Sequence, residues 1–232
     1  MLKHRVFVAA SLLLTIRPIG AEAQSVITRG GVGCGFGEHV GSLGNDILVT
    51  QAFGIGRYTP AGIYPTQIFL SPFGGNSAFG ASMAALGTDL LVGDPGAQPF
   101  AGADAVFLFD GSNSMITRTF YAPQAGANFG AAVAAVGTNV LVGAPTEGSG
   151  AGGAYLFNGS TGALLLTFVN PTPEADNGPT DAGDAFGTSV AALGGNVLVS
   201  APFDNTSGTD RWQAEFTEAR PNTAERFMAR VD

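Results

Sequence analysis

The sequence predicts an all-β protein in which successive four-stranded antiparallel sheets are arranged as the blades of a β-propeller. Three observations support this fold class. The chain of 232 residues contains 35 glycines and only 12% charged residues, which excludes a coiled coil, a helical bundle and a charge-rich disordered chain. A hairpin unit that begins with Phe-Gly occurs four times, and further strand patterns follow it. Four short strands in each period of roughly 40 to 60 residues are typical of a propeller blade.

The first 23 residues are predicted to be a signal peptide. Lys3 and Arg5 form a cationic start, residues 6–16 are apolar, and Ala21 and Ala23 supply the small-x-small pattern of a cleavage site. A membrane-spanning helix needs about 20 apolar residues, and this apolar run is far shorter. A buried core helix is the alternative. We therefore expect a protein without a membrane span after signal removal, secreted to the extracellular space (the periplasm or cell surface in a bacterium).

Charge and cysteine content narrow the classes of partner and site. The formal net charge of −8 argues against a nucleic-acid partner, because an acidic surface repels phosphate. Cys34 is the one cysteine of the chain, so an internal disulfide and a zinc site built on several cysteines are excluded. Stability must then come from packing and backbone pairing.

The repeated hairpins are the most informative feature of the sequence. Four segments align without gaps, and each has a glycine eight residues after its phenylalanine, an Asp or Asn two residues later, and then an aliphatic triplet. These segments are residues 36–52, 79–95, 129–145 and 186–202. Each consists of two apolar runs around a short Gly-containing turn, the pattern of a tight β-hairpin. The first run is rich in small residues, which suits strands crowded near an axis.

Third and fourth strands are expected after the hairpins. Residues 105–109 and 154–157 are predicted to be third strands, and residues 66–70 are their weaker counterpart. Residues 116–120 and 164–168 are predicted to be fourth strands. No segment has the apolar spacing of an amphipathic helix, so a helical repeat is excluded.

The motif at each end of the hairpin unit resembles a known repeat. Phe-Gly at residues 129–130 is followed by Gly-Ala-Pro at residues 143–145, and residues 93–95 and 200–202 carry variants of the second motif. This pattern resembles the FG-GAP repeat, which builds the propeller head of integrin α-chains and occurs in secreted bacterial proteins. The resemblance covers residues 36–210. It implies a propeller, usually of seven blades, that binds extracellular ligands, and it does not by itself imply an enzyme.

Two departures from that family change the expectations. Integrin-type repeats commonly carry an Asp-x-Asp/Asn-x-Asp-Gly calcium loop inside the hairpin, whereas this chain has only Gly87-Thr88-Asp89 or its equivalents. One carboxylate cannot supply the six to eight oxygens that calcium takes, so the family's calcium site is not carried over. The four hairpins also supply only about four blades, which predicts a partial or incomplete ring and a truncated or frameshifted member of the family.

The C-terminal segment differs in composition from the repeats. Residues 24–210 contain three basic and thirteen acidic side chains, whereas residues 211–232 contain four of each. We hypothesise that a frameshift or truncation interrupts the repeat near Asp210, so that the repeat propeller is residues 24–210 and residues 211–232 are a divergent tail. A genuine, divergent C-terminal segment is the alternative. An incomplete last blade would leave an open edge and predicts self-association through it.

One acidic loop is a candidate calcium site. The candidate ligands are Asp176, Asn177, Asp181 and Asp184, whose oxygens are the donors that calcium takes. A solvated loop is the alternative, because the spacing does not match an EF-hand. Asp204, Asn205 and Asp210 form a weaker candidate, and Asp94 and Asp104 bracket the equivalent loop of the second repeat.

The sequence favours a binding module over an enzyme. His39 is the one histidine after the signal, it lies in a repeat strand, and neither a Gly-x-Ser-x-Gly elbow nor a P-loop occurs. The expected role is adhesion or binding of an extracellular protein or glycan. The alternatives are a nonfunctional fragment of a longer FG-GAP protein and the accessory propeller of a secreted hydrolase. The expected contact surface comprises residues 94–104, 144–153, 172–185 and 203–210.

Overall fold

A computed structural model describes residues 36–73, 78–96, 104–124, 126–170 and 183–204, together with the backbone of six short strands outside these ranges. None of the described residues is helical. Within the same ranges, no helix has the length and apolar character needed to cross a bilayer. Predicted residues 1–23 lie outside the described ranges, apart from the backbone of three short strands.

The chain forms four successive sheets in which neighbouring strands run antiparallel and follow chain order. The first sheet contains β5 (Val40–Leu43), β6 (Asp46–Gln51), β7 (Gly54–Tyr58) and β8 (Gln67–Leu70). The second contains β9 (Ser82–Leu86), β10 (Asp89–Asp94), β11 (Ala105–Phe109) and β12 (Ile116–Tyr121). The third contains β13 (Ala132–Val136), β14 (Asn139–Ala144), β15 (Gly153–Asn158) and β16 (Leu164–Val169).

The last sheet begins with the hairpin of β17 (Val190–Leu193) and β18 (Asn196–Ala201). The backbone of β19 (Gln213–Glu218) and β20 (Arg226–Arg230) continues this sheet. The frameshift hypothesis for residues 211–232 stays a prediction. Near the N-terminus, β1 (Lys3–His4) pairs with β3 (Glu22–Ala23), and β2 (Phe7–Val8) pairs with β4 (Val26–Ile27), both in parallel.

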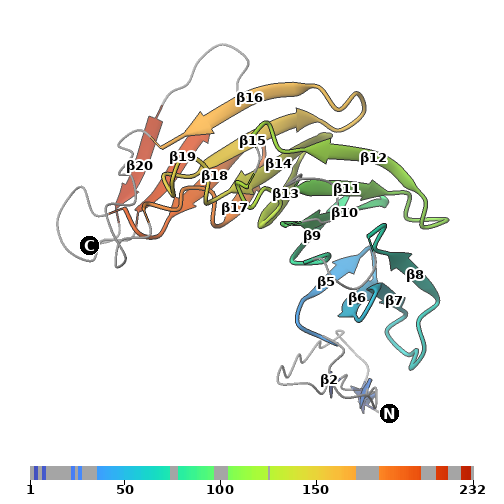
Figure 1. The fold of residues 1–232 in the computed structure, drawn as a ribbon. Helices are drawn as coiled ribbons and strands as arrows, with labels where there is room; N and C mark the ends of the chain where they lie inside the picture. The colour runs from blue at the N-terminus through green and yellow to red at the C-terminus, as the bar shows by residue number, and fades with distance from the viewer. Residues whose placement is uncertain are drawn as a thin grey trace.

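The sheets are arranged like neighbouring propeller blades (Figure 1). Their first strands lie against one another in the order β5, β9, β13 and β17, and each sheet extends outward from its first strand. The small side chains of these first strands, such as Ala84 and Ala134, permit this close approach. The predicted all-β class and the repeated four-stranded sheets are confirmed.

Tight turns join the first two strands of every sheet. Leu86 pairs with Asp89, and Val136 pairs with Asn139, so that two residues form each turn. The first turn residue is always glycine, and Gly87 and Gly137 have φ angles of 63° and 61°. Side chains with a Cβ rarely adopt this left-handed conformation, which explains the invariant glycine within the four hairpins.

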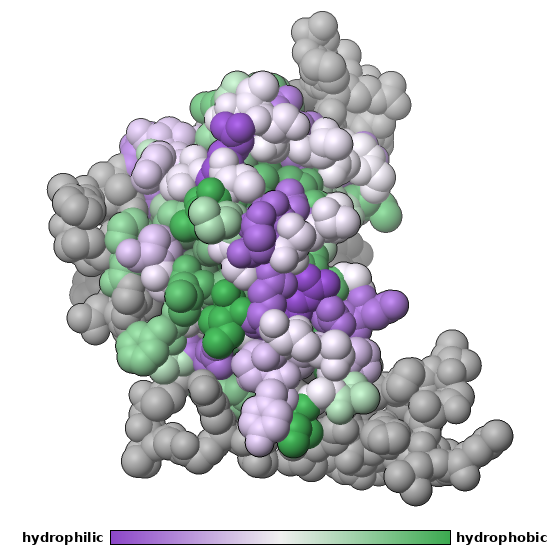
Figure 2. Space-filling view, turned by 90° about the vertical axis from the view of Figure 1, so that its right-hand side faces the viewer, coloured by the Kyte–Doolittle hydropathy of each residue, from purple (hydrophilic) through white to green (hydrophobic). Residues whose placement is uncertain are grey.

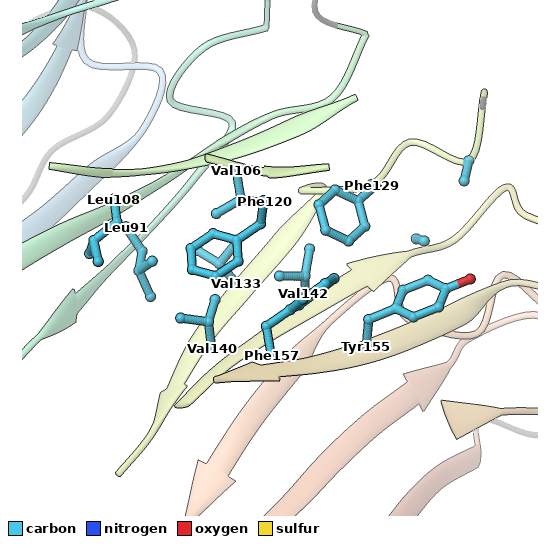
Figure 3. Packing of buried hydrophobic residues seen from close by; sticks show 12 residues of the cluster. Leu91, Val106, Leu108, Phe120, Phe129, Val133, Val140, Val142, Tyr155 and Phe157 are labelled. Carbon is cyan, nitrogen blue, oxygen red and sulfur yellow. The ribbon is translucent and has the colours of Figure 1, made fainter. Parts of the chain in front are cut away.

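The hydrophobic core lies between the sheets rather than inside any one of them. Along β14, Val140 and Val142 pack toward the second sheet, whereas Leu141 packs toward the fourth. Phe129 precedes the third sheet and has ring contacts with Tyr155 and Phe157. Figure 3 shows Val140, Val142 and the three aromatic side chains between the second and third sheets. Because successive side chains point to opposite faces of a strand, a continuous apolar triplet serves two interfaces at once.

The two halves of the repeated motif meet across neighbouring sheets. A Cβ built on Gly93 would lie 2.1 Å from the carbonyl oxygen of Gly130, and one on Gly143 would lie 2.0 Å from that of Gly187. Gly93 and Gly143 each lie one residue before the end of the second strand of their sheet, while Gly130 and Gly187 follow the phenylalanine that starts the next hairpin. Glycine is therefore required at Gly93 and Gly143, since the backbone of the following repeat lies directly against each of them.

One strand prediction is wrong for the first sheet. Residues 66–70 were expected to form its third strand, but β8 is the fourth, and the third strand is β7. Gly54 and Gly56 conceal β7 in the sequence, because glycine is depleted in strands. A two-residue connection at Ala52 and Phe53 replaces the longer connection that precedes the third strand in the next two sheets.

Candidate functional site at the loop end of the sheets

The antiparallel pairing gives the sheets two distinct ends. At the loop end lie the connections from the second to the third strand and those from one sheet to the next; the pairs Asp94–Ala105 and Ala144–Gly153 mark it. At the hairpin end lie the two-residue turns and the connections from the third to the fourth strand. All four loops expected to form the contact surface belong to the loop end. Their described parts are residues 94–96, 104, 144–153, 183–185 and 203–204.

Charge is distributed unevenly between the two ends. Within the described ranges, the loop end carries six acidic side chains and neither lysine nor arginine: Glu38, Asp94, Asp104, Glu147, Asp184 and Asp204. The described part of the hairpin end carries both described arginines, Arg57 and Arg118, with Asp46, Asp89 and Asp110. Asp94, Asp104, Asp184 and Asp204 are buried, so the accessible acidic side chains of the described loop end are Glu38 and Glu147, which favour a cationic partner over phosphate.

Asp104 has a structural role at the loop end. Its side chain is 3% exposed, and its two oxygens accept hydrogen bonds from the backbone N–H groups of Gly96 at 2.7 Å and Phe129 at 3.0 Å. It thus ties its own loop to the first residue of the next repeat. In the third sheet, backbone bridging between Gly152 and Phe186 forms the corresponding link. Asp104 is accordingly occupied by protein donors, as buried carboxylates generally are.

A second carboxylate is held by side chains of the same end. Glu147 accepts a hydrogen bond from the Gln124 amide at 2.9 Å through Oε1, and another from the Tyr155 hydroxyl through Oε2. Burial is the main cause that raises the pKa of Tyr155 above its usual range, and the Glu147 carboxylate raises it further. The phenol is therefore a proton donor to Glu147, and it fixes the loop of residues 145–152 against β15.

The predicted calcium loop is described only in part. Asp176, Asn177 and Asp181 lie outside the described residues. Asp184 is 1% exposed, and its Oδ2 accepts a hydrogen bond from the Asn170 side-chain amide at 2.6 Å. No group of three His, Cys, Asp or Glu side chains in the described ranges is arranged to hold a metal ion. The calcium site stays a prediction.

The weaker calcium candidate also straddles the boundary of the described residues. Asp204 is buried, and its backbone N–H donates to the carbonyl of Ala201 at 3.3 Å, whereas Asn205 and Asp210 lie outside the described ranges. Asp94 is buried at the end of β10, beside the strand that Asp104 precedes. The structure thus brings the two bracketing carboxyl residues to the same end of the second sheet.

Exposed aromatic side chains accompany the acids at the loop end. Phe53, Tyr121 and Phe203 are 64%, 60% and 55% exposed, and each lies at or beside the loop-end terminus of a strand. Aromatic groups combine a large apolar area with few rotatable bonds, which makes them favourable contact residues. No sequence pattern distinguished these exposed aromatic residues, because most phenylalanines of the repeats lie in the core.

His39 precedes β5 at the loop end and is exposed. Its backbone N–H donates to the Thr50 hydroxyl oxygen at 3.0 Å, and its carbonyl accepts a hydrogen bond from the Thr50 backbone N–H at 3.1 Å. These contacts use the backbone of His39 to extend the pairing between the first two strands. The role of His39 that these contacts show is therefore structural.

The hairpin end contains a cleft that sequence reasoning missed. It has a volume of about 400 Å³ and lies between the second and third sheets; its lining includes Leu86, Asp89, Leu108, Thr117, Arg118 and Gly159. Figure 2 faces this side of the molecule and shows hydrophilic side chains gathered beside hydrophobic ones. These residues come from separate turns and strands, so no linear motif unites them. The equivalence of Arg57 and Leu108 is visible only from the strand pairing, so the sequence alone offered no signal for this cleft.

No protein-family model matches the chain, and no curated protein matches it either. The family resemblance of the repeated motif therefore rests on the residues themselves.

Proposed function

We propose that the protein is a secreted or cell-surface FG-GAP repeat module that binds an extracellular protein or glycan through the loop end of its sheets. The main support for this proposal is that the connections of successive sheets lie at one end, where acidic side chains and exposed aromatic side chains occur together. A rigid array of sheets that presents variable loops is a common basis for binding. The proposed activity is recognition or adhesion without catalysis.

The contact between the two motif halves supports the FG-GAP assignment. Gly93 and Gly143 each lie against the carbonyl of the following Phe-Gly unit, and Phe129 and Phe186 are buried between sheets. The pattern that suggested the family thus corresponds to one repeated physical contact. Such a contact is expected where each repeat stabilises its neighbour.

A direct binding experiment tests the proposal. Residues 24–232 would be immobilised and exposed to a panel of extracellular matrix proteins and glycans, with binding followed by biolayer interferometry. We expect saturable binding to at least one member of the panel. The double variant Tyr121→Ser/Phe203→Ser should abolish this binding because it removes exposed loop-end aromatic groups. Met115→Ser is the matched control, since Met115 is 65% exposed near the hairpin end.

The same preparation separates the competing functions. A monodisperse, folded protein without saturable binding to any panel member would contradict a binding module. Aggregation of the otherwise intact chain in analytical ultracentrifugation would favour a nonfunctional fragment with an open sheet edge. Binding that survives the loop-end variant but is lost in Met115→Ser would contradict the placement of the contact surface.

A further inference from the structure

Two neighbouring interfaces are built from equivalent positions at the hairpin end. The first interface lies between the first and second sheets, and the second interface lies between the second and third sheets. Strand pairing matches Leu48 with Arg57 in the first sheet and Leu91 with Leu108 in the second. The next strand pairs Arg57 with Gln67 and Leu108 with Arg118. Leu108 therefore takes the position of Arg57, and Arg118 takes that of Gln67. By the same alignment, Asp89 corresponds to Asp46 and Gly159 to Gly111.

In the first interface, the Arg57 side chain occupies the space between the sheets. Its Nε donates to Asp46 Oδ2 at 2.7 Å, and its Nη1 donates to the Gly111 carbonyl at 2.7 Å and to Gln67 Oε1 at 3.2 Å. Gly111 belongs to the second sheet's connection between β11 and β12. One guanidinium thus joins a carboxylate, an amide and a carbonyl across two sheets.

In the second interface, the equivalent space is the cleft of about 400 Å³. Its lining includes Asp89, Leu108, Arg118 and Gly159, which are the counterparts of Asp46, Arg57, Gln67 and Gly111. Leu108 is shorter than arginine and packs into the core. Within the described part of the chain, no cationic side chain pairs with Asp89, whose Oδ1 accepts a hydrogen bond from the Gly111 backbone N–H at 3.3 Å.

The surrounding backbone is placed alike in both interfaces. A Cβ on Gly111 would lie 3.2 Å from Leu43 Cδ2, and a Cβ on Gly159 would lie 3.1 Å from Leu86 Cδ2. Leu43 and Leu86 are themselves equivalent, since each ends the first strand of its sheet. The two sheet pairs are therefore spaced alike at this end. The cleft follows from the exchange of arginine for leucine rather than from a wider gap between sheets.

We propose that this cleft binds an alkylguanidinium group, which takes the place that the Arg57 side chain has in the first interface. Asp89 and the Gly159 carbonyl would accept hydrogen bonds from the guanidinium, and Leu86 and Leu108 would contact its alkyl chain. The site lies at the end opposite the proposed loop-end contact surface. Its occupancy is therefore independent of the proposed function, and failure of either proposal leaves the other intact.

Arg118 sets the affinity of the site. Its Nη1 donates to the Thr161 carbonyl at 2.9 Å and its Nη2 to the Ser160 carbonyl, which directs the guanidinium toward the connection between β15 and β16. Its charge nevertheless opposes a cationic ligand. Replacement of Arg118 by glutamine would remove that charge and supply the amide acceptor that Gln67 provides in the first interface. The ligand should therefore bind more tightly to Arg118→Gln than to the native chain.

Ethylguanidinium, which reproduces the end of an arginine side chain, is the probe. Its binding to residues 24–232 would be followed by amide chemical-shift perturbation in NMR titrations, with neutral ethylurea as the isosteric control. We expect saturable shifts at Leu86, Leu108 and Gly159, and none with ethylurea. A capped Gly-Arg-Gly peptide distinguishes the source of the group: tighter binding than ethylguanidinium supports the side chain of a partner protein, and peptide exclusion supports a free small cation.

Four variants test the geometry. Asp89→Asn should lower the affinity for ethylguanidinium about tenfold or more, because the charged acceptor is lost, whereas Arg118→Gln should raise it about tenfold. Leu108→Arg should abolish binding by filling the cleft with the side chain seen in the first interface. Arg57→Leu should create a second site between the first two sheets and raise the stoichiometry from one to two.

The proposal is overturned if ethylguanidinium and ethylurea give the same shifts, or if Asp89→Asn leaves the ethylguanidinium affinity unchanged. Leu108 is buried, so Leu108→Arg is the variant with the greatest risk of misfolding. Asp89→Asn hardly changes the side-chain volume. It therefore still tests the proposal if Leu108→Arg does not fold. Circular dichroism of every variant confirms that loss of binding is not loss of the fold.

Discussion

The first and second interfaces between sheets solve the same packing problem with different chemistry at the hairpin end. In the first, the Arg57 guanidinium joins Asp46 to the carbonyl of Gly111. In the second, Leu108 replaces the arginine, and a cleft lined by Asp89 remains. The difference shows that the two interfaces place their bridging guanidinium at different positions, because Arg118 joins the second and third sheets through the carbonyls of Thr161 and Ser160.

The two interfaces also differ in the burial of the leading phenylalanine, which is the first residue of the hairpin unit (Phe79 in the first interface and Phe129 in the second). Phe129 is fully buried in the second interface, whereas Phe79 is only partly buried in the first. Both rings contact a pair of aromatic residues of the sheet that follows. The second interface thus buries its phenylalanine more fully, while both interfaces contain polar contacts, from Arg57 in the first and from Arg118 in the second.

Removal of the leading phenylalanine should have the largest effect and should differ between the interfaces. Phe129→Ala is expected to lower the free energy of unfolding by about 3–5 kcal/mol, because it leaves a cavity in a close-packed core. Phe79→Ala is expected to cost less, since its ring is partly exposed already. Urea denaturation followed by circular dichroism measures both values. Equal losses would contradict the assignment of the greater apolar burial to the second interface.

The close glycine contact should be the next most sensitive feature. Gly93→Ala is expected to lower the free energy of unfolding by about 2–3 kcal/mol, since its Cβ would lie 2.1 Å from the Gly130 carbonyl oxygen and the backbone must shift. Gly195→Ala is the matched control, because a Cβ there meets no atom within 4 Å, and it should change the value by less than about 0.5 kcal/mol. The same urea titrations apply, and similar values for both variants would refute the contact.

The polar bridge of the first interface should contribute a smaller amount. Arg57→Leu reproduces the residue of the second interface and is expected to lower the free energy of unfolding by about 1 kcal/mol, because both charged side chains are partly exposed. The difference from the native chain should shrink as salt concentration rises, since salt screens the pair. Denaturation at low and at 1 M salt measures this dependence. A salt-independent loss would assign the effect to packing instead.

The Tyr155–Glu147 contact at the loop end should have its own pH signature. The pKa of Tyr155 is raised from 10.0 in the folded protein, so the neutral phenol stabilises the fold fully below about pH 10. This contribution is lost as pH rises above that value. Tyr155→Phe should lower the free energy of unfolding by about 1 kcal/mol at pH 8, and the gap should narrow at pH 11. A gap that widens toward pH 11 would reverse the assigned sign.

The sequence was most informative where one local pattern recurs. The four hairpins, with glycines such as Gly87 and Gly137 in left-handed turns, were predictable because each follows from contacts between residues close in the chain. The third strand β7 was missed, since Gly54 and Gly56 resemble a loop. Gly54 is required there by a nearby carbonyl, as a Cβ would lie 2.2 Å from the oxygen of Phe69, and that proximity arises only in the folded sheet.

The candidate sites were less predictable than the strands, because they join residues from separate elements. The aligned loops indicated the end of the sheets at which Asp94 and Asp104 lie, while the calcium site that includes Asp184 stays a prediction. They gave no sign that Asp104 binds two backbone N–H groups. The cleft depends on the exchange of Arg57 for Leu108 at positions that align only after strand pairing is known.

A crystal structure of Leu108→Arg tests most directly whether the sheets are repeats of one unit with equivalent interfaces. The account predicts that the introduced arginine enters the cleft and donates hydrogen bonds to the Asp89 carboxylate and the Gly159 carbonyl, as Arg57 does to Asp46 and Gly111. An introduced side chain that turns to solvent, with the cleft still open between undisturbed sheets, would contradict that equivalence.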